Sequence, residues 1–430
     1  MMSFTSFSYH LKLLIKFLIK LYLAKYYFLK NKNKIYNLKK KLKKNNRYLA
    51  LLNVGSIGSL ASQINYFYKF SIINNLSLEN SFYFIASDKK ISNSYFIDKI
   101  SQEIDINFDD TLYRSLLLPG NLTQFKKEKI LIEFKNDFVN YLPTKNFKIN
   151  LTTQDINDAK KIFNKLGLNY EQKIVAFSIK NNFYWKQKYR IDKNWDTYRI
   201  SSIENIKESV NYLSSKDYQT VLLGDYSNPD ILKVKDCNIC TTEKLTKVEK
   251  EIFDIVIFDK LSFACFGATG LRFVADLFNV PMVSHNGFLP QWQSDGIFLP
   301  KLIRYKKNKK TVPLRNLLQK KFINYNLDDG FLKIRFLETL IFRDQLQFDL
   351  KKLEIIENSS KEILNAIKEL EDYILSNKKN LDIIDNEYQD KVRNIFFNNS
   401  VFSKSEVNYG VNFGGYYSIN FLKNYKNYTD

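Results

Sequence analysis

Cysteine and histidine are scarce in this chain of 430 residues, which contains three cysteines and two histidines. Cys237 and Cys240 form a lone Cys-x-x-Cys pair, and Cys265 lies apart from them. Three cysteines do not make the disulfide framework of a small secreted protein, and a structural zinc site needs four ligands. We therefore expect reduced thiols in a cytosolic protein, with neither a metal site nor a bound cofactor.

Acidic residues are missing from the beginning of the chain, where the first one is Glu79. Fourteen lysines and arginines precede it, so two thirds of the formal net charge of +21 lies in the first 78 residues. A charge this uneven indicates a basic end with a specific anionic partner. Binding of DNA or RNA through this end is one alternative. Because the rest of the chain is only mildly basic, we expect no nucleic-acid partner.

A long uninterrupted apolar run is also missing from residues 10–30, HLKLLIKFLIKLYLAKYYFLK. Lys12, Lys16 and Lys20 recur every four residues, which on a helix gives a narrow cationic stripe beside a wide apolar face. The lysines are too frequent for a membrane-spanning helix, and no signal-peptide cleavage pattern follows. We expect residues 1–46 to be a basic amphipathic helix and linker on an anionic membrane surface, aided by the lysines of 39–44. The alternative is a helix packed on the protein itself.

An alternation of predicted strands and helices begins at residue 47. The apolar segment 48–54 predicts a strand, the small residues of 55–59 predict a turn, and the apolar spacing after them predicts a helix. A second strand is predicted over 81–87, which completes a βαβ unit. We therefore expect residues 47–165 to form a doubly wound domain, closed by a helix over 154–166 with Gly167 as its C-cap.

The most informative segment is 253–287, FDIVIFDKLSFACFGATGLRFVADLFNVPMVSHNG. Its apolar runs 255–258 and 263–266 predict a strand that enters a turn at Gly267–Gly270, and a helix and a short strand follow. The turn sits at the carboxyl end of its strand, where open α/β sheets bind ligands. Its small residues would let a phosphate approach the amides at the start of the helix. The alternative is a tight turn that binds nothing.

Further predicted strands at 173–179, 219–224 and 281–284 place this unit in a second domain, which we expect to span residues 166–350. Residues 351–430 are expected to form a helical tail. Within it, Ser359 and Glu362 have the spacing of a capping box, which marks the start of a helix.

The order of these motifs resembles a group of bacterial glycosyltransferases of the GT-B class that are associated with surface-polysaccharide synthesis. The resemblance covers roughly residues 170–425 and rests on four collinear segments. They are VAFSIKNNFYW (175–185), YRISSIENIKESVNYLSSKDYQTVLLGD (198–225), FDIVIFDKLSFACFGATGLRFVADLFNVPMVSHN (253–286) and LEIIENSSKEILNAIKELE (353–371). The resemblance implies two Rossmann-like doubly wound domains that face a cleft, with the end of the chain partly crossing back to the first domain.

The resemblance also implies where the substrates bind. The donor-binding candidates are Lys180, Arg199, Thr269, Gly270, Arg272, His285 and Asn286. The candidates for an acceptor-side loop are Gly55, Ser56, Gly58 and Ser59. Cations and amide donors would stabilise the charge that develops on the nucleoside diphosphate as the glycosidic bond breaks, so a metal is not required. Each position also has an ordinary alternative, such as a solvated Lys180, a capping Thr269 or a buried structural His285.

Several positions depart from the family's pattern. Lys180 stands where the family usually has arginine, and Asn181 where it has aspartate. Ser59 stands where histidine is frequent, and Leu222 where a cation is frequent. A different donor or a weakened enzyme would explain these departures. Asp88, just after the second predicted strand, is the candidate base of an inverting mechanism, whereas a retaining mechanism would need no base there.

The sequence therefore predicts a glycosyltransferase in the cytoplasm, peripheral on the inner face of the cell membrane. It would transfer a sugar from a nucleotide sugar to a lipid-linked or oligosaccharide acceptor of a surface glycan. The alternative is a non-catalytic binding or scaffold protein on a degenerate GT-B fold.

Overall fold

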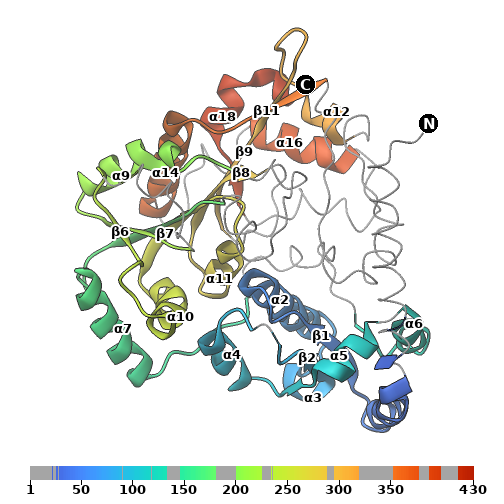
Figure 1. Ribbon diagram of the computed structural model, residues 1–430. Coiled ribbons are helices and arrows are strands. Elements are labelled where there is room, and N and C mark those ends of the chain that lie inside the picture. The colour runs from blue at the N-terminus through green and yellow to red at the C-terminus, as the bar shows by residue number, and fades with distance from the viewer. Residues whose placement is uncertain are drawn as a thin grey trace, which may run out of the picture.

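The protein is an α/β molecule with two separate parallel sheets, shown in a computed structural model (Figure 1). The structure describes residues 22, 26–27, 29–89, 91–117, 119–132, 146–180, 200–224, 234, 236–287, 295–318, 352–376, 387–398 and 415–430. The predicted α/β class is confirmed by the parallel pairing of the strands within both sheets.

The first sheet contains the parallel strands β1 (Tyr48–Leu52), β2 (Phe82–Ala86) and β3 (Ile106–Phe108), in that order. Leu131 forms a parallel bridge to Leu49 on the other side of β1. The chain therefore leaves β1 toward β3 and later returns on the opposite side. A reversal of this kind is the switch point at which open α/β sheets bind ligands, and here it lies at β1.

Helix α2 (Ile57–Ile73) follows β1 and is buried on almost every side. It begins at Ser56, whose side chain accepts a hydrogen bond from the Ser59 amide. Phe67 packs on Phe82 and Phe84 of β2, with ring centroids 5.7 and 5.6 Å apart. A helix that is apolar around its circumference needs cover on more than one face. The other helices of this part are α3 (Leu78–Ser81), α4 (Ser94–Ser101), α5 (Asp110–Leu116) and α6 (Pro119–Lys127).

The second sheet has seven strands in the order β12-β9-β8-β7-β4-β5-β6. They are β4 (Ile174–Ser178), β5 (Gln219–Leu222), β6 (Ile239–Thr241), β7 (Leu261–Phe266), β8 (Met282–Gly287), β9 (Gly296–Pro300) and β12 (Tyr416–Tyr417). From β4 the chain moves outward to β5 and β6, and then returns to β7 on the other side of β4. This is the strand order of the dinucleotide-binding fold, extended by one strand, and its switch point lies between β4 and β7.

Helices cover both faces of this sheet (Figure 1). They are α7 (Thr153–Leu166), α9 (Lys207–Ser214), α10 (Lys247–Val256), α11 (Leu271–Leu277), α12 (Leu314–Leu318), α14 (Ser360–Leu375), α16 (Glu387–Asn398) and α18 (Ile419–Asn424). An antiparallel pair, β10 (Leu302–Tyr305) and β11 (Leu353–Ile356), lies beside them. α7 ends at Gly167 in a left-handed conformation, as predicted.

Two details of the sequence prediction were wrong. Residues 255–258 do not belong to a strand: α10 continues through Val256, and a 3₁₀ turn follows over Ile257–Asp259. The physical reason is the capping box of Thr246 and Glu249, which starts an amphipathic helix whose apolar face includes this run. The tail expected to be helical from residue 351 begins instead with a strand, because 353–356 form β11, and its helix starts at Ser360 after the predicted capping box at Ser359.

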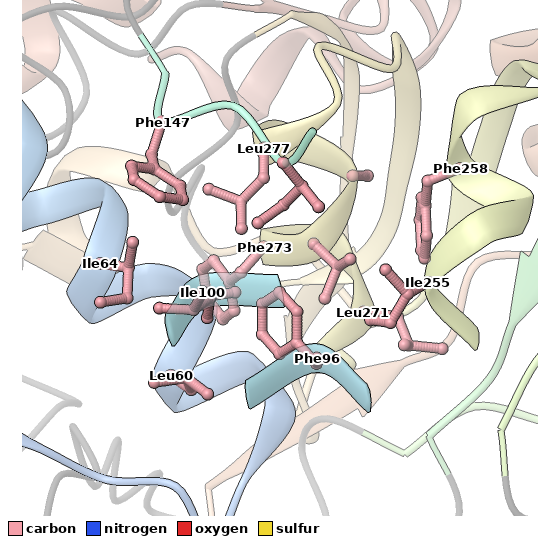
Figure 2. Close-up of a cluster of buried hydrophobic side chains, with 14 of the residues drawn as sticks. Leu60, Ile64, Phe96, Ile100, Phe147, Ile255, Phe258, Leu271, Phe273 and Leu277 are labelled. Atoms are coloured by element: carbon pink, nitrogen blue, oxygen red, sulfur yellow. The ribbon is translucent and has the colours of Figure 1, made fainter. Parts of the chain in front are cut away.

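One continuous hydrophobic core joins the two parts of the molecule. Figure 2 shows Leu60 and Ile64 of α2 beside Phe96 and Ile100 of α4, across from Leu271, Phe273 and Leu277 of α11. All of these residues are buried and belong to one cluster that also contains β4 and β7. α2 therefore packs on its own sheet and on α11 of the other.

A chain of hydrogen-bonded side-chain amides, of which Asn65 and Asn146 are buried and Asn279 is exposed, crosses the same interface. Asn65 of α2 donates to Asn146 Oδ1 at 3.0 Å, and Asn146 donates to Asn279 Oδ1, just after α11, at 2.9 Å. The Phe147 amide donates to Asn65 Oδ1 at 3.0 Å. Such satisfied polar groups fix the register of the contact as well as its strength.

The N-terminal region packs on the first sheet in its described part. Residues 29–44 are helical, and Ile35, Leu38 and Leu42 are buried in a cluster with residues of β1, β2 and α6. Lys39 and Lys43 form ion pairs with Glu128. Of the predicted linker, the part after residue 28 is therefore a packed helix. The tract with Lys12, Lys16 and Lys20 lies outside the described residues. No helix in the described ranges is long and apolar enough to cross a membrane.

The described C-terminal tail belongs to the second sheet. β12 pairs with β9, and Gln389 of α16 exchanges two hydrogen bonds with the Tyr417 backbone, at 2.7 and 3.1 Å. Glu369 of α14 accepts from the amides of Ile419 and Asn420 at the start of α18. The crossing of the tail to the first domain stays a prediction.

Candidate functional site

The turn predicted from the sequence lies at the switch point of the second sheet. β4 ends at Ser178 and its neighbour β7 ends at Phe266, so Gly267–Gly270, here called the switch-point turn, begins between their carboxyl ends. The Gly267 amide donates to Ser178 O at 2.8 Å, which fixes the turn to β4. Helix α11 then starts at Leu271 and has seven residues, so its dipole is weaker than a long helix would supply.

Gly267 brings three other segments together. A Cβ at this position would lie 3.4 Å from Ser178 O, 3.4 Å from Ser201 Oγ and 3.6 Å from His285 Cε1. These residues come from the end of β4, the segment before α9, and β8. The three segments therefore pack closely around Gly267, at distances of ordinary van der Waals contact from the position that a Cβ would take.

The loop after β1, at the switch point of the first sheet, reaches the switch-point turn of the second sheet. Gly58, in the first turn of α2, meets Gly270 so closely that a Cβ on Gly58 would lie 2.5 Å from Gly270 Cα. The start of α2 and the switch-point turn are thus in direct backbone contact. The candidate acceptor loop and the candidate donor loop are consequently adjacent.

Three buried polar atoms around the turn lack a hydrogen-bond partner in the part of the chain that the structure describes. They are Ser201 Oγ, Thr269 Oγ1 and His285 Nε2. Buried side-chain oxygens and nitrogens are nearly always bonded, and leaving one unmet costs about 1–3 kcal/mol. Three such groups around one turn make it the candidate site of this sheet.

His285 and Asn286 are held by the segment before α14. Asn286 Nδ2 lies 2.9 Å from His285 Nδ1, and Asn286 Oδ1 accepts from the Asn358 amide at 2.9 Å. The Asn286 amide donates to Asn358 Oδ1 at 2.7 Å. Both polar atoms of the Asn286 side chain thus have hydrogen-bond partners in the protein, whereas His285 Nε2 has none among the described residues. Burial, with a smaller contribution from the charge of Lys301, lowers the pKa of His285 to about 3, so its ring is neutral at pH 7.

A buried lysine and a carboxylate lie close to this group. Lys301, which follows β9, donates to Ile200 O. Burial lowers its pKa to about 8, opposed by the negative charge of Glu357. Glu357 accepts from the Ser202 amide at 2.8 Å and from Asn205 Nδ2 at 3.4 Å. These contacts hold the segment that carries Ser201 against the carboxyl end of the sheet.

The other predicted donor residues have different positions. Lys180 is half-buried after β4, and its carbonyl accepts from the Ser201 amide at 3.2 Å. Arg272 is buried on α11, with its guanidinium carbon 5.0 Å from the centroid of the Phe273 ring. Leu222 is fully buried in β5, so this position belongs to the core. Arg199 and Asn181 lie outside the described residues.

The predicted acceptor-side loop follows β1. The Gly55 amide donates to Asn53 Oδ1 at 3.1 Å, and Ser56 caps α2 by accepting from Ser59. Asp88 is exposed in the loop after β2, and its role as the catalytic base remains a prediction. The buried carboxylate nearby is Asp110, which Ser87, Lys89 and Arg114 contact. Its oxygens are therefore occupied by structural partners.

Sequence reasoning missed Ser201, Lys301 and Asn358. Ser201 lies in an irregular segment, and no local pattern relates it to a turn more than sixty residues later. Asn358 was visible only as part of the Glu-Asn-Ser helix start. A signal for Lys301 was its place directly after a fully apolar strand, where a lysine is unusual.

Two parallel sheets, each with a switch-point loop and with the two loops in contact, define a protein of two Rossmann-like halves. No family model matches the sequence, and no curated protein matches it significantly. Solved structures do match. The glycosyl transferase family 9 protein of Veillonella parvula is 11% identical, with 60% of this chain and 87% of that chain covered and a TM-score of 0.38. The ADP-heptose LPS heptosyltransferase II of E. coli is 13% identical, and the match covers 55% of this chain and 84% of that chain with a TM-score of 0.35.

The UDP-GlcNAc 2-epimerase of Methanocaldococcus jannaschii also matches, at 11% identity. That match covers 58% of this chain and 64% of that chain, and its TM-score is 0.24. These similarities concern the fold. Glycosyltransferases, the class that the sequence motifs resemble, are among the solved structures to which the fold is similar.

Proposed function

We propose that this protein is a glycosyltransferase that takes a sugar from a nucleotide-sugar donor and transfers it to a surface-glycan acceptor. The single observation that carries the proposal is the switch-point turn with its unmet polar atoms, pressed against the start of α2. Ligands of doubly wound sheets bind at this point. A site shared by two Rossmann-like halves suits a reaction that joins two substrates.

The donor would bind on the side of the second sheet. Backbone amides of the switch-point turn and the Thr269 hydroxyl would donate to the pyrophosphate, and Lys180 would supply positive charge. Such groups accelerate transfer when they stabilise the charge that develops on the leaving nucleoside diphosphate. Arg199, Arg272 and Gly270 remain donor-binding candidates from the family resemblance.

The acceptor would approach from the first sheet, along Gly55, Ser56 and Ser59. Asp88 is the proposed base if the reaction inverts the sugar configuration. A lipid-linked acceptor would agree with the basic N-terminal tract, which would hold the protein at the inner face of the cell membrane. No ligating group of three or more acidic, histidine or cysteine side chains exists among the described residues, and the proposed chemistry uses none.

The test is thermal unfolding of the full-length protein with a panel of UDP, ADP, GDP and CDP and their sugars. A ligand at a hundred times its Kd stabilises the folded state by about 2.7 kcal/mol. Stabilisation by one nucleotide series supports the proposal, and its absence across the panel overturns it. Thr269→Val should weaken this stabilisation, whereas Thr429→Val, remote from the site, should not.

Thr269→Val also tests the proposal through the stability of the unliganded protein. The Thr269 hydroxyl is buried without a partner in the described structure, so removing it should leave the unliganded protein equally stable or more stable. A hydroxyl kept at a cost to stability is typical of a binding residue.

A binding or scaffold protein on the same fold is the second candidate. It is favoured by Leu222, which is buried where related enzymes often have a cation, and by Ser59, which replaces a frequent histidine. This candidate predicts nucleotide binding without turnover. Release of nucleoside diphosphate from a nucleotide sugar, lost in Lys180→Ala, would exclude it.

A further inference from the structure

The N-terminal helix has two opposite faces, and only one of them packs on the protein. In its described part, residues 22, 26–27 and 29–44, the inward face includes Ile35, Leu38 and Leu42, which are at most 6% exposed. The outward face carries four large side chains that are between 49% and 72% exposed, namely Tyr22, Tyr26, Leu29 and Tyr36. At 3.6 residues per turn these four positions fall within about 80° of arc, opposite the inward face.

Elsewhere in the described residues, exposed apolar side chains do not form such a row. Nine large hydrophobic side chains are exposed there, and four of them are the outward row of this one helix. The other five are two neighbours at the end of α2 and single residues at positions 91, 248 and 375. Single exposed apolar residues are ordinary on a protein surface, whereas a group of them on one face indicates a binding surface.

The same face of the helix is basic. Its row continues into Lys40 and Lys44, which are exposed, and Lys32 is exposed on its flank. No acidic residue precedes Glu79 in the sequence, so the helix has no carboxylate of its own to balance these lysines. The outward face therefore complements a partner that is anionic at its surface and apolar just below it.

An anionic lipid bilayer has both of these properties. Tyrosine is enriched at the level of the headgroups, because its ring is apolar and its hydroxyl is polar. Lysine can bury its aliphatic stem there and keep its ammonium group among the headgroups. A protein partner suits this face less well, because lysine is depleted in the cores of protein interfaces. A nucleic acid would suit the lysines, but it would leave Leu29 without apolar contact.

The inward contacts fix where this face lies relative to the first sheet. Lys34 forms an ion pair of 2.9 Å with Asp109, which directly follows β3. After the helix, Arg47 donates to the carbonyl of Phe82 at the start of β2. The helix thus runs along the sheet from its carboxyl edge toward its amino edge. The end that carries Leu29 lies at the carboxyl edge, which also holds the candidate acceptor-side loop.

We propose that the outward face of the N-terminal helix is a docking surface for an anionic lipid bilayer, and that docking sets the carboxyl edge of the first sheet beside the headgroups. The inference rests on the proposed function for the acceptor, which would meet the protein at that edge. Asn31 donates to Ser115 Oγ of α5 at 2.9 Å, so the helix is already held in place and its outward face is preformed.

The first experiment removes the apolar row and leaves residues 1–28 unchanged. Full-length protein with Leu29→Gln and Tyr36→Gln should sediment with vesicles of phosphatidylcholine and phosphatidylserine about ten-fold more weakly than the unchanged protein. Val248→Gln with Leu375→Gln is the matched control, since these residues are 68% and 73% exposed on α10 and α14, and it should bind as before. Exposed positions contribute little to stability, so both double variants should keep the melting temperature.

The second experiment tests the charge of the same face. Lys40→Gln and Lys44→Gln should each weaken vesicle binding about five-fold at low salt, and the difference should shrink at high salt. Lys423→Gln with Lys426→Gln changes two exposed lysines of the C-terminal tail and should have no such effect. None of these proteins should sediment with vesicles of phosphatidylcholine alone as strongly as with the anionic vesicles.

The third experiment locates the contact. Tyr36→Trp adds one fluorophore to the three tryptophans of the chain, and its contribution is the difference from the unchanged protein. Brominated phospholipids should quench this added emission, because the ring would lie within the bilayer interface. The same substitution at Val248 should add emission that the brominated lipid leaves unquenched.

The outcomes separate the docking surface from the proposed function. Weaker vesicle binding by the outward-face variants, with nucleotide stabilisation retained, supports both. If those variants bind vesicles as the unchanged protein does, or if they instead abolish a dimer or binding to RNA, the docking surface is wrong whatever the nucleotides do. If vesicle binding follows the outward face but no nucleotide stabilises the protein, the docking surface is supported, and the proposed function fails together with the role of the carboxyl edge.

Discussion

Gly58 and Gly270, on opposite sides of the junction between the two sheets, touch through their backbones. A Cβ on Gly58 would lie 2.5 Å from Gly270 Cα and 2.8 Å from Gly270 O. A Cβ on Gly270 would have more room, at 3.1 Å from Gly58 Cα and 3.2 Å from Gly58 N. The contact is therefore asymmetric, although both residues are glycines.

This asymmetry predicts a ranking of two alanine variants. Gly58→Ala should lower the free energy of unfolding by about 1–3 kcal/mol or more, because backbone cannot move aside as a flexible side chain can. Gly270→Ala should cost less. Urea unfolding followed by circular dichroism gives both values. Equal stability of Gly58→Ala and the unchanged protein would show that the helix and the turn are not in contact.

The buried Lys69 of α2 predicts a pH dependence. Burial lowers its pKa to about 8 from 10.5, opposed by the negative charge of Asp276 on α11. Between these two values the unfolded chain holds a proton that the folded protein has lost. The contribution of Lys69 to stability should therefore rise from about pH 8 to pH 10.5, by a few kcal/mol at most.

Lys69→Met removes this group but keeps its length. The free energy of unfolding, measured in urea between pH 7 and 10.5, should rise less with pH in the variant than in the unchanged protein. Since other lysines and tyrosines titrate in the same range, only the difference between the two proteins is diagnostic. Parallel curves would refute a depressed pKa at Lys69.

The packed N-terminal helix predicts a contrast between apolar and ionic contacts. Leu42 is 1% exposed, so Leu42→Ala should cost about 2–5 kcal/mol of stability. Glu128→Gln removes the ion pairs with Lys39 and Lys43 and should have a small effect, reduced further by salt. Thermal unfolding at low and high salt separates the two. A larger loss from Glu128→Gln would mean that charge, not burial, holds this helix.

The structure also sharpens the membrane prediction. A deletion of residues 8–28 removes Lys12, Lys16 and Lys20 but keeps the helix from residue 29 onward. The shortened protein should stay folded and should no longer sediment with vesicles that contain phosphatidylserine at low salt, because both charge and apolar area are lost. Equal sedimentation of the two proteins, or none by the full-length chain, would remove the membrane from the proposal.

Local patterns predicted the strands and turns that position the site. The run ending at Phe266, the small residues of 267–270 and the helix after them were all visible in one segment. The same segment misled at residues 255–258, because a short apolar run has no period that separates a buried strand from the end of a helix. The start of α10 at Thr246 was the missing clue.

The partners of the site could not be predicted in the same way. His285 was a candidate, but its direction depends on Asn358, which is far away in the sequence and bonds through backbone and side chain together. Ser201 reaches Gly267 because Lys180, Lys301 and Glu357 hold its segment. Contacts of this kind depend on the packing of whole elements, and no spacing in the chain encodes them.

The sharing of α2 between two sheets has a consequence for synthesis on the ribosome. The apolar face of α2 that contains Leu60 and Ile64 is covered by α11, which is translated about two hundred residues later. During that interval the strands of the first sheet have been synthesised, but the α11 helix that covers this face of α2 has not. Nascent chains stalled before residue 271 should therefore bind chaperones or aggregate. Chains stalled well beyond residue 271 should do neither.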